Sequence, residues 1–155
     1  ESCSMSSSED DMTIRVRLAD WPPMEEAASS VRREVFIVEQ GVPEALEWDE
    51  HDASSLHALA EDARGEVLGT ARLLPDGHIG RMAVRRCWRG RGVGAALLGA
   101  LVARARARGD TRIALSAQVS AIGFYERFGF VAEGPVFDDA GIPHRRMVLR
   151  RAPAR

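Results

Sequence analysis

A run of glycines and arginines directly before a strongly helical segment constrains the fold of this chain more than any other feature. The run is Arg-Gly-Arg-Gly-Val-Gly, residues 89–94. Residues 92–108 are rich in Ala and Leu, carry apolar side chains along one side and end at Gly109, which is typical of a helix with a glycine stop. Residues 78–84 before the run have the pattern of a strand. We therefore expect a strand, a glycine-rich turn and a long helix in succession.

The position of this turn predicts a site for an anion. A helix N-terminus exposes main-chain N–H groups and carries partial positive charge, while glycines let a phosphate approach without meeting a Cβ atom. Arg89 and Arg91 would add positive charge. A Walker-type nucleotide loop is excluded because it requires Lys, which the chain lacks. The glycine spacing does not fit a dinucleotide-binding fingerprint, and a turn that simply begins a helix remains the alternative.

Strand and helix patterns alternate along the rest of the chain. Residues 13–19 alternate apolar and polar side chains, which predicts a strand that Trp21-Pro22-Pro23 stops. Residues 24–40 have helical spacing, and an acidic loop is expected at 43–54. The remaining predicted elements are strands at 55–61, 67–74, 78–84, 111–117, 130–132 and 144–150 and a short helix at 120–128. This order predicts an α/β domain with a mixed sheet.

Length and composition allow one domain. The chain has 155 residues, of which 45% are hydrophobic and 28% charged, as in ordinary globular proteins with one core. Residues 1–12 offer almost nothing to bury, so we expect a disordered leader or expression remnant there and a single folded domain over 13–151. Since no apolar run approaches the roughly 20 residues of a membrane span and no secretory signal is evident, a cytoplasmic protein without membrane contact is expected.

Charge and cysteine content exclude further classes. The formal net charge is −2, with acids interspersed among the arginines, which argues against a nucleic-acid partner. The cysteines are Cys3 and Cys87, too few for a disulfide framework or a Cys-based zinc site, and the four histidines lack zinc-like spacing. We expect no metal, and interpret Cys87 as a loop or packing residue instead of a nucleophile.

Two motifs resemble the signatures of the GNAT superfamily of acyl-CoA-dependent N-acyltransferases. Arg89, Gly92 and Gly94 fill an RxxGxG string that is similar to the superfamily's acetyl-CoA-binding motif. Residues 121–130, AIGFYERFGF, resemble its second signature, and the element order resembles it over residues 13–150. A further likeness to the ElaA-like branch rests on residues 33–36, 39–43 and 141–145.

The resemblance implies a fold and a donor site. The fold would be a central, mostly antiparallel sheet with a splayed pair of strands, flanked by helices. The donor would be acetyl-CoA as cosubstrate, with its pantetheine arm along the fourth strand and its pyrophosphate on the glycine-rich turn. Gln118 stands where the superfamily often has Asn, and its amide can make the same hydrogen bonds. The implied acetyl-CoA-binding residues are Met82, Ala83, Val84, Arg89, Gly90, Arg91, Gly92, Val93, Gly94, Gln118 and Phe124.

The resemblance also implies a reaction, in which a primary amine of a small molecule or peptide attacks the thioester directly. Tyr125, the only Tyr in the chain, is the implied general acid, because a phenol of pKa about 10 is matched to a thiol of pKa about 8.5 to 10. The general base stays open among Glu39, Glu47, Asp49, His144 and an ordered water that relays the proton. Acids between residues 39 and 52 suggest a cleft for a cationic amine.

Two alternatives concern activity and assembly. A non-catalytic acyl-CoA-binding or regulatory module would keep the turn without the chemistry, and the presence of Tyr125 favours catalysis over it. GNAT domains often dimerise through late strands, so a homodimer is compatible with the resemblance.

Overall fold

The computed structural model describes residues 13–43 and 51–150. The leader expected at residues 1–12 and the domain's expected end at residue 151 lie outside these ranges. In chain order the elements are β1 (Arg15–Asp20), α1 (Trp21–Arg32), η2 (Arg33–Glu39), α3 (His51–Ser54), β2 (Leu56–Glu61), β3 (Val67–Leu73), β4 (Ile79–Val84), η3 (Arg86–Trp88), α4 (Val93–Ala107), β5 (Arg112–Gln118), η4 (Val119–Ala121), α5 (Ile122–Glu126), β6 (Val131–Asp139) and β7 (Ile142–Arg150).

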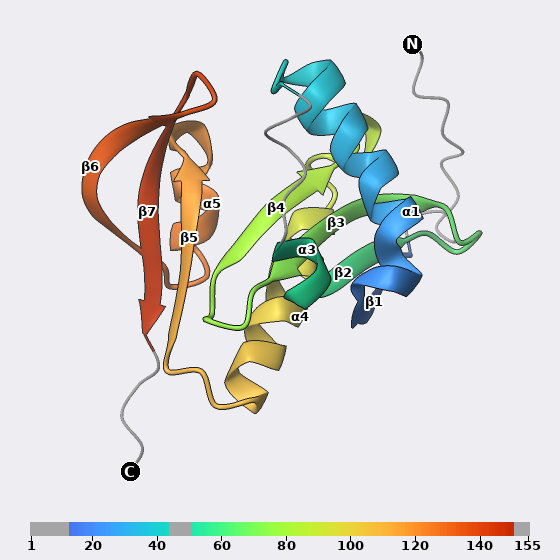
Figure 1. The fold of residues 1–155 in the computed structure, drawn as a ribbon, viewed down its shortest axis with the longest axis horizontal. Helices are drawn as coiled ribbons and strands as arrows, with labels where there is room; N and C mark the ends of the chain where they lie inside the picture. The colour runs from blue at the N-terminus through green and yellow to red at the C-terminus, as the bar shows by residue number, and fades with distance from the viewer. Residues whose placement is uncertain (1–12, 44–50, 151–155) are drawn as a thin grey trace.

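The strands form two antiparallel sheets that meet at one point. The first sheet has the order β1-β2-β3-β4 and the second the order β5-β7-β6. The strands β4 and β5 run parallel and come together just before β4, where His78 bridges Ala114 and the Gly77 carbonyl accepts the Ala114 N–H at 3.1 Å. Beyond that point they diverge (Figure 1). The expected mixed α/β fold with a splayed pair of strands is confirmed.

A β-bulge bends β4 where it begins to diverge from β5. Thr70 pairs with Ala83 and Arg72 with Gly80. The chain therefore advances by three residues along β4, from Gly80 to Ala83, where it advances by two along β3. Arg81, inside this stretch, has φ +48°, in the left-handed region. Since bulges bend a strand and end its regular pairing, this one accounts for the outer edge of β4 turning away from β5.

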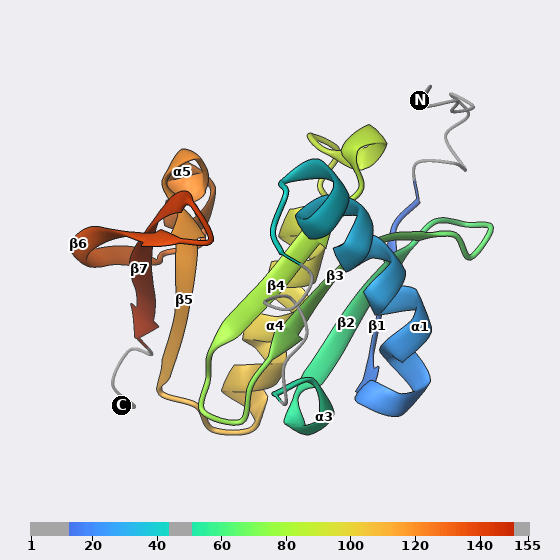
Figure 2. The ribbon, with the colours of Figure 1, turned by 45° about the horizontal axis from the view of Figure 1, so that its top comes forward.

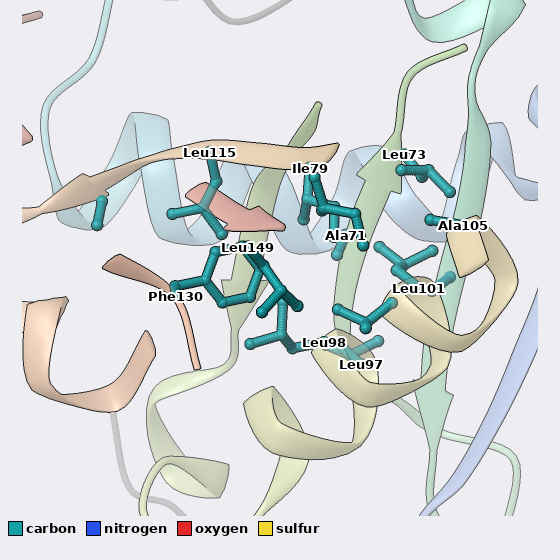
Figure 3. Packing of buried hydrophobic residues seen from close by; sticks show 14 of the residues in the cluster. Ala71, Leu73, Ile79, Leu97, Leu98, Leu101, Ala105, Leu115, Phe130 and Leu149 are labelled. Atoms are coloured by element: carbon teal, nitrogen blue, oxygen red, sulfur yellow. The ribbon is translucent and has the colours of Figure 1, made fainter. Parts of the chain in front are cut away.

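Helices α1 and α4 cover opposite faces of the first sheet (Figure 2). The buried side of α4 carries Leu97, Leu98 and Leu101, which pack with Ala71 and Leu73 of β3. Figure 3 shows Phe130, which directly precedes β6, and Leu149 of β7 beside these leucines. The core therefore continues behind the point where the two sheets separate, and holds the splayed strands in place.

The first helix differs from the sequence expectation at both ends. It begins at Trp21, because Pro22 and Pro23 lie in its first turn, where N–H groups lack intrahelical partners and proline is tolerated. From Arg33 it continues as the π-helix η2, in which the Gln40 N–H reaches the Val35 carbonyl at 3.0 Å. The expected helix at 24–40 is therefore two kinds of helix, and the wider one carries the chain to the opening between β4 and β5.

Two other segments also differ from the expectation. The predicted loop at 43–54 ends in the short helix α3, and its residues 44–50 lie outside the described ranges. The predicted strand at 130–132 extends to Asp139 as β6, although Gly134 and Pro135 interrupt the pattern, because a register shift between Glu133 and Phe137 takes up the extra residues. The β6–β7 hairpin thereby reaches the same opening.

Candidate active site

The opening between β4 and β5 is a cleft of about 890 Å³. Its walls come from β4, the glycine-rich turn with the start of α4, the ends of η2 and β5, helix α5 and the β6–β7 turn. The expected site residues that line it are Met82, Ala83, Val84, Arg89, Gly90, Gly92, Val93, Gly94, Gln118, Phe124 and Tyr125, with His144 among the candidate bases. The structure thus brings together expected site residues from both sheets and from helices α4 and α5.

The glycine-rich turn adopts a conformation that needs glycine. Gly90 and Gly92 have φ of +76° and +88°, and Gly92 is the N-cap of α4. The first intrahelical bond is donated by Ala96 to the Gly92 carbonyl at 3.0 Å, so the N–H groups of the three residues between them precede it. A Cβ atom on Gly92 would point into open space. An anion can therefore approach these N–H groups closely, which is the arrangement the sequence predicts.

The two arginines of the turn make different contacts. The Arg89 guanidinium binds the Glu39 carboxylate in two hydrogen bonds, the longer of them 2.8 Å, and its Nε donates to the Val84 carbonyl at 3.1 Å. Arg91 lies over the Trp88 ring, 5.4 Å from its centroid. Arg89 therefore links the glycine-rich turn to the end of η2, and it also lines the cleft.

Glu39 is consequently a poor candidate for the general base. The hydrogen bonds from Arg89 hold the pKa of Glu39 below its usual value, and a carboxylate that keeps its charge so firmly accepts a proton from an amine less readily. The candidates Glu47 and Asp49 lie outside the described residues.

A glutamine pair spans the cleft. The Gln118 side-chain amide, at the end of β5, donates to Gln40 Oε1 at 3.2 Å, and both residues line the cleft. Gln40 carries no signal in the sequence that distinguishes it from other polar residues at a helix end. The end of η2 and the residue after it therefore contact both sides, Glu39 at the glycine-rich turn and Gln40 at β5.

The outer edge of β4 presents main-chain groups to the cleft. The Arg85 N–H donates to the Leu68 carbonyl of β3 at 2.8 Å, and main-chain groups of successive strand residues point in alternate directions. Val84 consequently faces away from β3, and its carbonyl accepts the hydrogen bond from Arg89, while Ala83 faces β3 and pairs with Thr70. Met82 lies inside the β-bulge, between the paired residues Ala83 and Gly80.

Tyr125 lies in an apolar part of the cleft wall. Its ring meets Phe124 and Phe130 edge-on at centroid distances of 5.0 and 6.1 Å, and its hydroxyl donates to Met82 Sδ at 3.9 Å. Burial raises the pKa of Tyr125 to about 12. The phenol therefore stays protonated at neutral pH, next to the outward edge of β4, with a thioether sulfur as its acceptor, which is a weak one.

A buried cluster of charges beside the cleft was not anticipated from the sequence. Asp52 Oδ1 accepts hydrogen bonds from Arg32 at 2.8 Å and from Arg72 at 2.9 Å, and all three side chains are buried. Asp52 and Glu39 are thus both bound to arginine, whereas the other acids on which the expected cleft for a cationic amine rests lie outside the described residues. The sequence offered one signal for this cluster. Arg72 lies within a predicted strand whose other side chains are mostly apolar, and a buried charge requires a partner.

Two general properties concern the described residues. No group of three or more His, Cys, Asp or Glu side chains among them is placed to hold a metal ion. Within residues 13–43 and 51–150, no helix combines the length and the apolar character needed to cross a membrane. Cys87 packs against the main core.

Known proteins share both the sequence and the fold. Residues 20–151 match the family described as the acetyltransferase (GNAT) domain. The uncharacterized N-acetyltransferase YjcF of Bacillus subtilis is 36% identical over 121 residues, which cover 76% of this chain and 86% of YjcF. A crystal structure of an acyl-CoA N-acyltransferase from Pseudomonas aeruginosa has 33% identity and a TM-score of 0.77, over 90% of this chain and 100% of that one.

Escherichia coli ElaA, the namesake of the branch that the sequence resembles, has a similar structure. It is 27% identical, with a TM-score of 0.79 over 90% of this chain and 100% of its own. The family match covers most of the chain and includes every cleft-lining segment described above. The chain therefore belongs to the GNAT acetyltransferase family and is an acyltransferase.

Proposed function

We propose that this protein transfers an acetyl group from acetyl-CoA to a primary amine of a small molecule or peptide, by direct attack of the amine on the thioester. The observation that carries the proposal is the position of the Tyr125 hydroxyl, which lies at Met82 on the outward edge of β4 inside the cleft. The choice of an acetyl group is supported by one relative named an uncharacterized N-acetyltransferase and another named a putative acetyltransferase.

The glycine-rich turn would bind the pyrophosphate of the donor. Support comes from the open space at Gly92 and the N–H groups at the start of α4, since such groups and the helix dipole favour an anion. Gly94 lies against the ring of Phe124, where an added Cβ would stand 3.5 Å from the ring edge. Phe124 would thus form one wall of the donor's path from the turn into the cleft.

The pantetheine arm would follow β4 as an added strand. Met82 and Val84 line the cleft along β4, and amides of an extended ligand can pair with such a strand edge. An outward N–H from the same edge would polarise the thioester carbonyl and stabilise the negative oxygen of the tetrahedral intermediate. Gln118 would contact the arm from the opposite side of the cleft.

Tyr125 would protonate the departing thiolate. Its raised pKa keeps the phenol protonated at neutral pH, so that a proton is available when the thiolate departs. Because Met82 Sδ is a weak acceptor, the hydroxyl can turn to a new sulfur at little cost. Burial among Phe124 and Phe130 also excludes water from this part of the site.

The proposal is tested by titrating purified protein with acetyl-CoA, CoA and NADH in a calorimeter and then measuring thiol release with a panel of amines. Saturable binding of acetyl-CoA and amine-dependent release of CoA are expected, with no binding of NADH. Binding without release by any amine would favour the non-catalytic acyl-CoA-binding module. Absence of CoA binding would contradict the donor site altogether.

A further inference from the structure

His144 lies where the second sheet opens into the cleft. It is near the start of β7, opposite Gln118 of β5 on one side and Phe137 of β6 on the other. It is half-buried, and it lines the cleft together with Gln118 and Ile142. Its position is therefore on the wall opposite β4, along which the donor is proposed to lie.

Two contacts fix the His144 ring and its tautomer. Nδ1 lies 2.7 Å from the Ile142 carbonyl oxygen. Because a carbonyl oxygen can only accept, Nδ1 carries a proton, and in the neutral ring Nε2 then has the free lone pair. The Phe137 ring stacks on the imidazole at a centroid distance of 6.0 Å and an interplanar angle of 25°. The ring is thus held as an imidazole whose basic nitrogen is Nε2.

The other described groups that line the cleft are less suited to accept a proton. The arginines are permanently charged donors, and Tyr125 is a phenol held in its neutral form. Asp139 is an exposed residue at the end of β6, beside the hairpin turn. His78 sits at the point where the two sheets meet, with Nδ1 3.3 Å from the Asp76 carboxylate. His144 combines a defined tautomer, partial burial and a place at the wide part of the opening.

We infer that His144 is the general base that removes a proton from the acceptor ammonium, an inference that rests on the proposed function. Nε2 takes one proton from the ammonium, which leaves a neutral amine and an imidazolium. The amine nitrogen then forms a bond to the thioester carbon, and the C–S bond breaks from the tetrahedral intermediate. The acceptor amine would accordingly bind between the start of β7 and the β6–β7 turn.

Tyr125 accounts for the proton that the thiolate gains and for the second proton that the nitrogen loses. The leaving thiolate takes the phenolic proton, and the resulting phenolate takes the second proton from the nitrogen of the new amide. His144 releases its proton to solvent. The net change is one ammonium and one thioester converted into one amide, one thiol and one proton, so each of the two protons lost by nitrogen has a named acceptor.

The first test compares His144→Ala with His144→Gln, using acetyl-CoA and a panel of spermidine, glucosamine and a short peptide with a free N-terminus. Both variants are expected to bind acetyl-CoA as the wild type does and to lose about 100-fold or more in turnover. Free imidazole should restore part of the activity of His144→Ala, because it can enter the vacated space and accept the proton. His51→Ala, at an exposed histidine that does not line the cleft, serves as the control and should keep its activity.

The possible outcomes distinguish a failure of His144 as the base from a failure of the proposed function. Wild-type protein that releases no thiol with any amine would contradict the proposed function, and the base with it. Active wild type together with active His144→Ala would overturn the base alone. Activity restored by Gln, which can keep the hydrogen bond to the Ile142 carbonyl but cannot serve as the base, would show that His144 only positions the hairpin.

A second measurement needs no acceptor. Nitrogen–proton correlation spectra of the imidazole rings, with His144→Gln used for assignment, should show the proton of neutral His144 on Nδ1. A proton on Nε2 in the wild type would remove the basic nitrogen from the cleft side and overturn the inference, whatever the activity of the variants.

Discussion

Glu39 and Arg89 hold each other through two hydrogen bonds between the end of η2 and the glycine-rich turn. The pair is partly exposed, and Arg89 also donates to the Val84 carbonyl. An incoming pyrophosphate would compete with the Glu39 carboxylate for the same guanidinium. The end of η2, which Gln40 directly follows, would thereby be coupled to occupation of the proposed donor site.

The change Glu39→Gln is expected to strengthen the binding of acetyl-CoA. Removal of the carboxylate frees the Arg89 guanidinium and removes a negative charge near the proposed phosphate position. Since partly exposed ion pairs contribute about 0.2 to 1 kcal/mol, the gain should reach at most about fivefold in Kd. Calorimetry measures it, and Glu61→Gln, which breaks the comparable exposed pair with Arg17, is the control. Weaker binding would mean that the pair instead orders the turn for the donor.

The change Tyr125→Phe should lower turnover and leave acetyl-CoA affinity nearly intact. The hydroxyl makes one long contact, to Met82 Sδ, so its removal disturbs packing little, whereas a general acid typically contributes about 10² to 10⁴ in rate. Steady-state kinetics and calorimetry on the same preparation separate the two effects. Equal losses in rate and affinity would assign Tyr125 to packing.

The ionisation of Tyr125 should be displaced to high pH. Burial favours the neutral phenol and raises its pKa to about 12, so at pH 11 about nine-tenths of it should be protonated, whereas an ordinary phenol of pKa about 10 would be about nine-tenths ionised. The chain has one Tyr, so near-ultraviolet phenolate absorbance reports this group alone. Circular dichroism at each pH must show that the fold persists. A midpoint near 10 in folded protein would contradict the buried environment.

Local pattern in the sequence predicted the elements that form the donor side of the cleft. The turn at 89–94 and the helix after it follow from glycine, alanine and leucine content alone, and α4 begins within one residue of its expected start. The ends of η2 and β6 could not be predicted in this way, because a π-helix and a register shift depend on tertiary contacts more than on local propensity.

The contacts within the candidate site likewise differ in whether local sequence pattern could predict them. Tyr125 and the glycine-rich turn belong to compact motifs that the sequence singled out, and both line the cleft. The pair of Glu39 with Arg89 joins residues 50 positions apart, and that of Gln40 with Gln118 joins residues 78 apart. Pairings at such separation depend on how the sheets splay. The Arg32–Asp52–Arg72 cluster is a similar case, since its arginines approach one carboxylate from α1 and β3.

The change Gly92→Val should weaken acetyl-CoA binding by about tenfold or more, equivalent to about 1.4 kcal/mol. A side chain there would project into open space beside the N–H groups of α4 and crowd the proposed pyrophosphate, and φ of +88° is strained for any residue with a Cβ atom. Gly109→Val separates these two causes, because Gly109 has φ of +97° and equally open surroundings at the other end of the helix. Both variants should lose thermal stability, and only Gly92→Val should lose affinity in calorimetry. Equal affinity in the two variants would leave the turn as a helix start without a donor site.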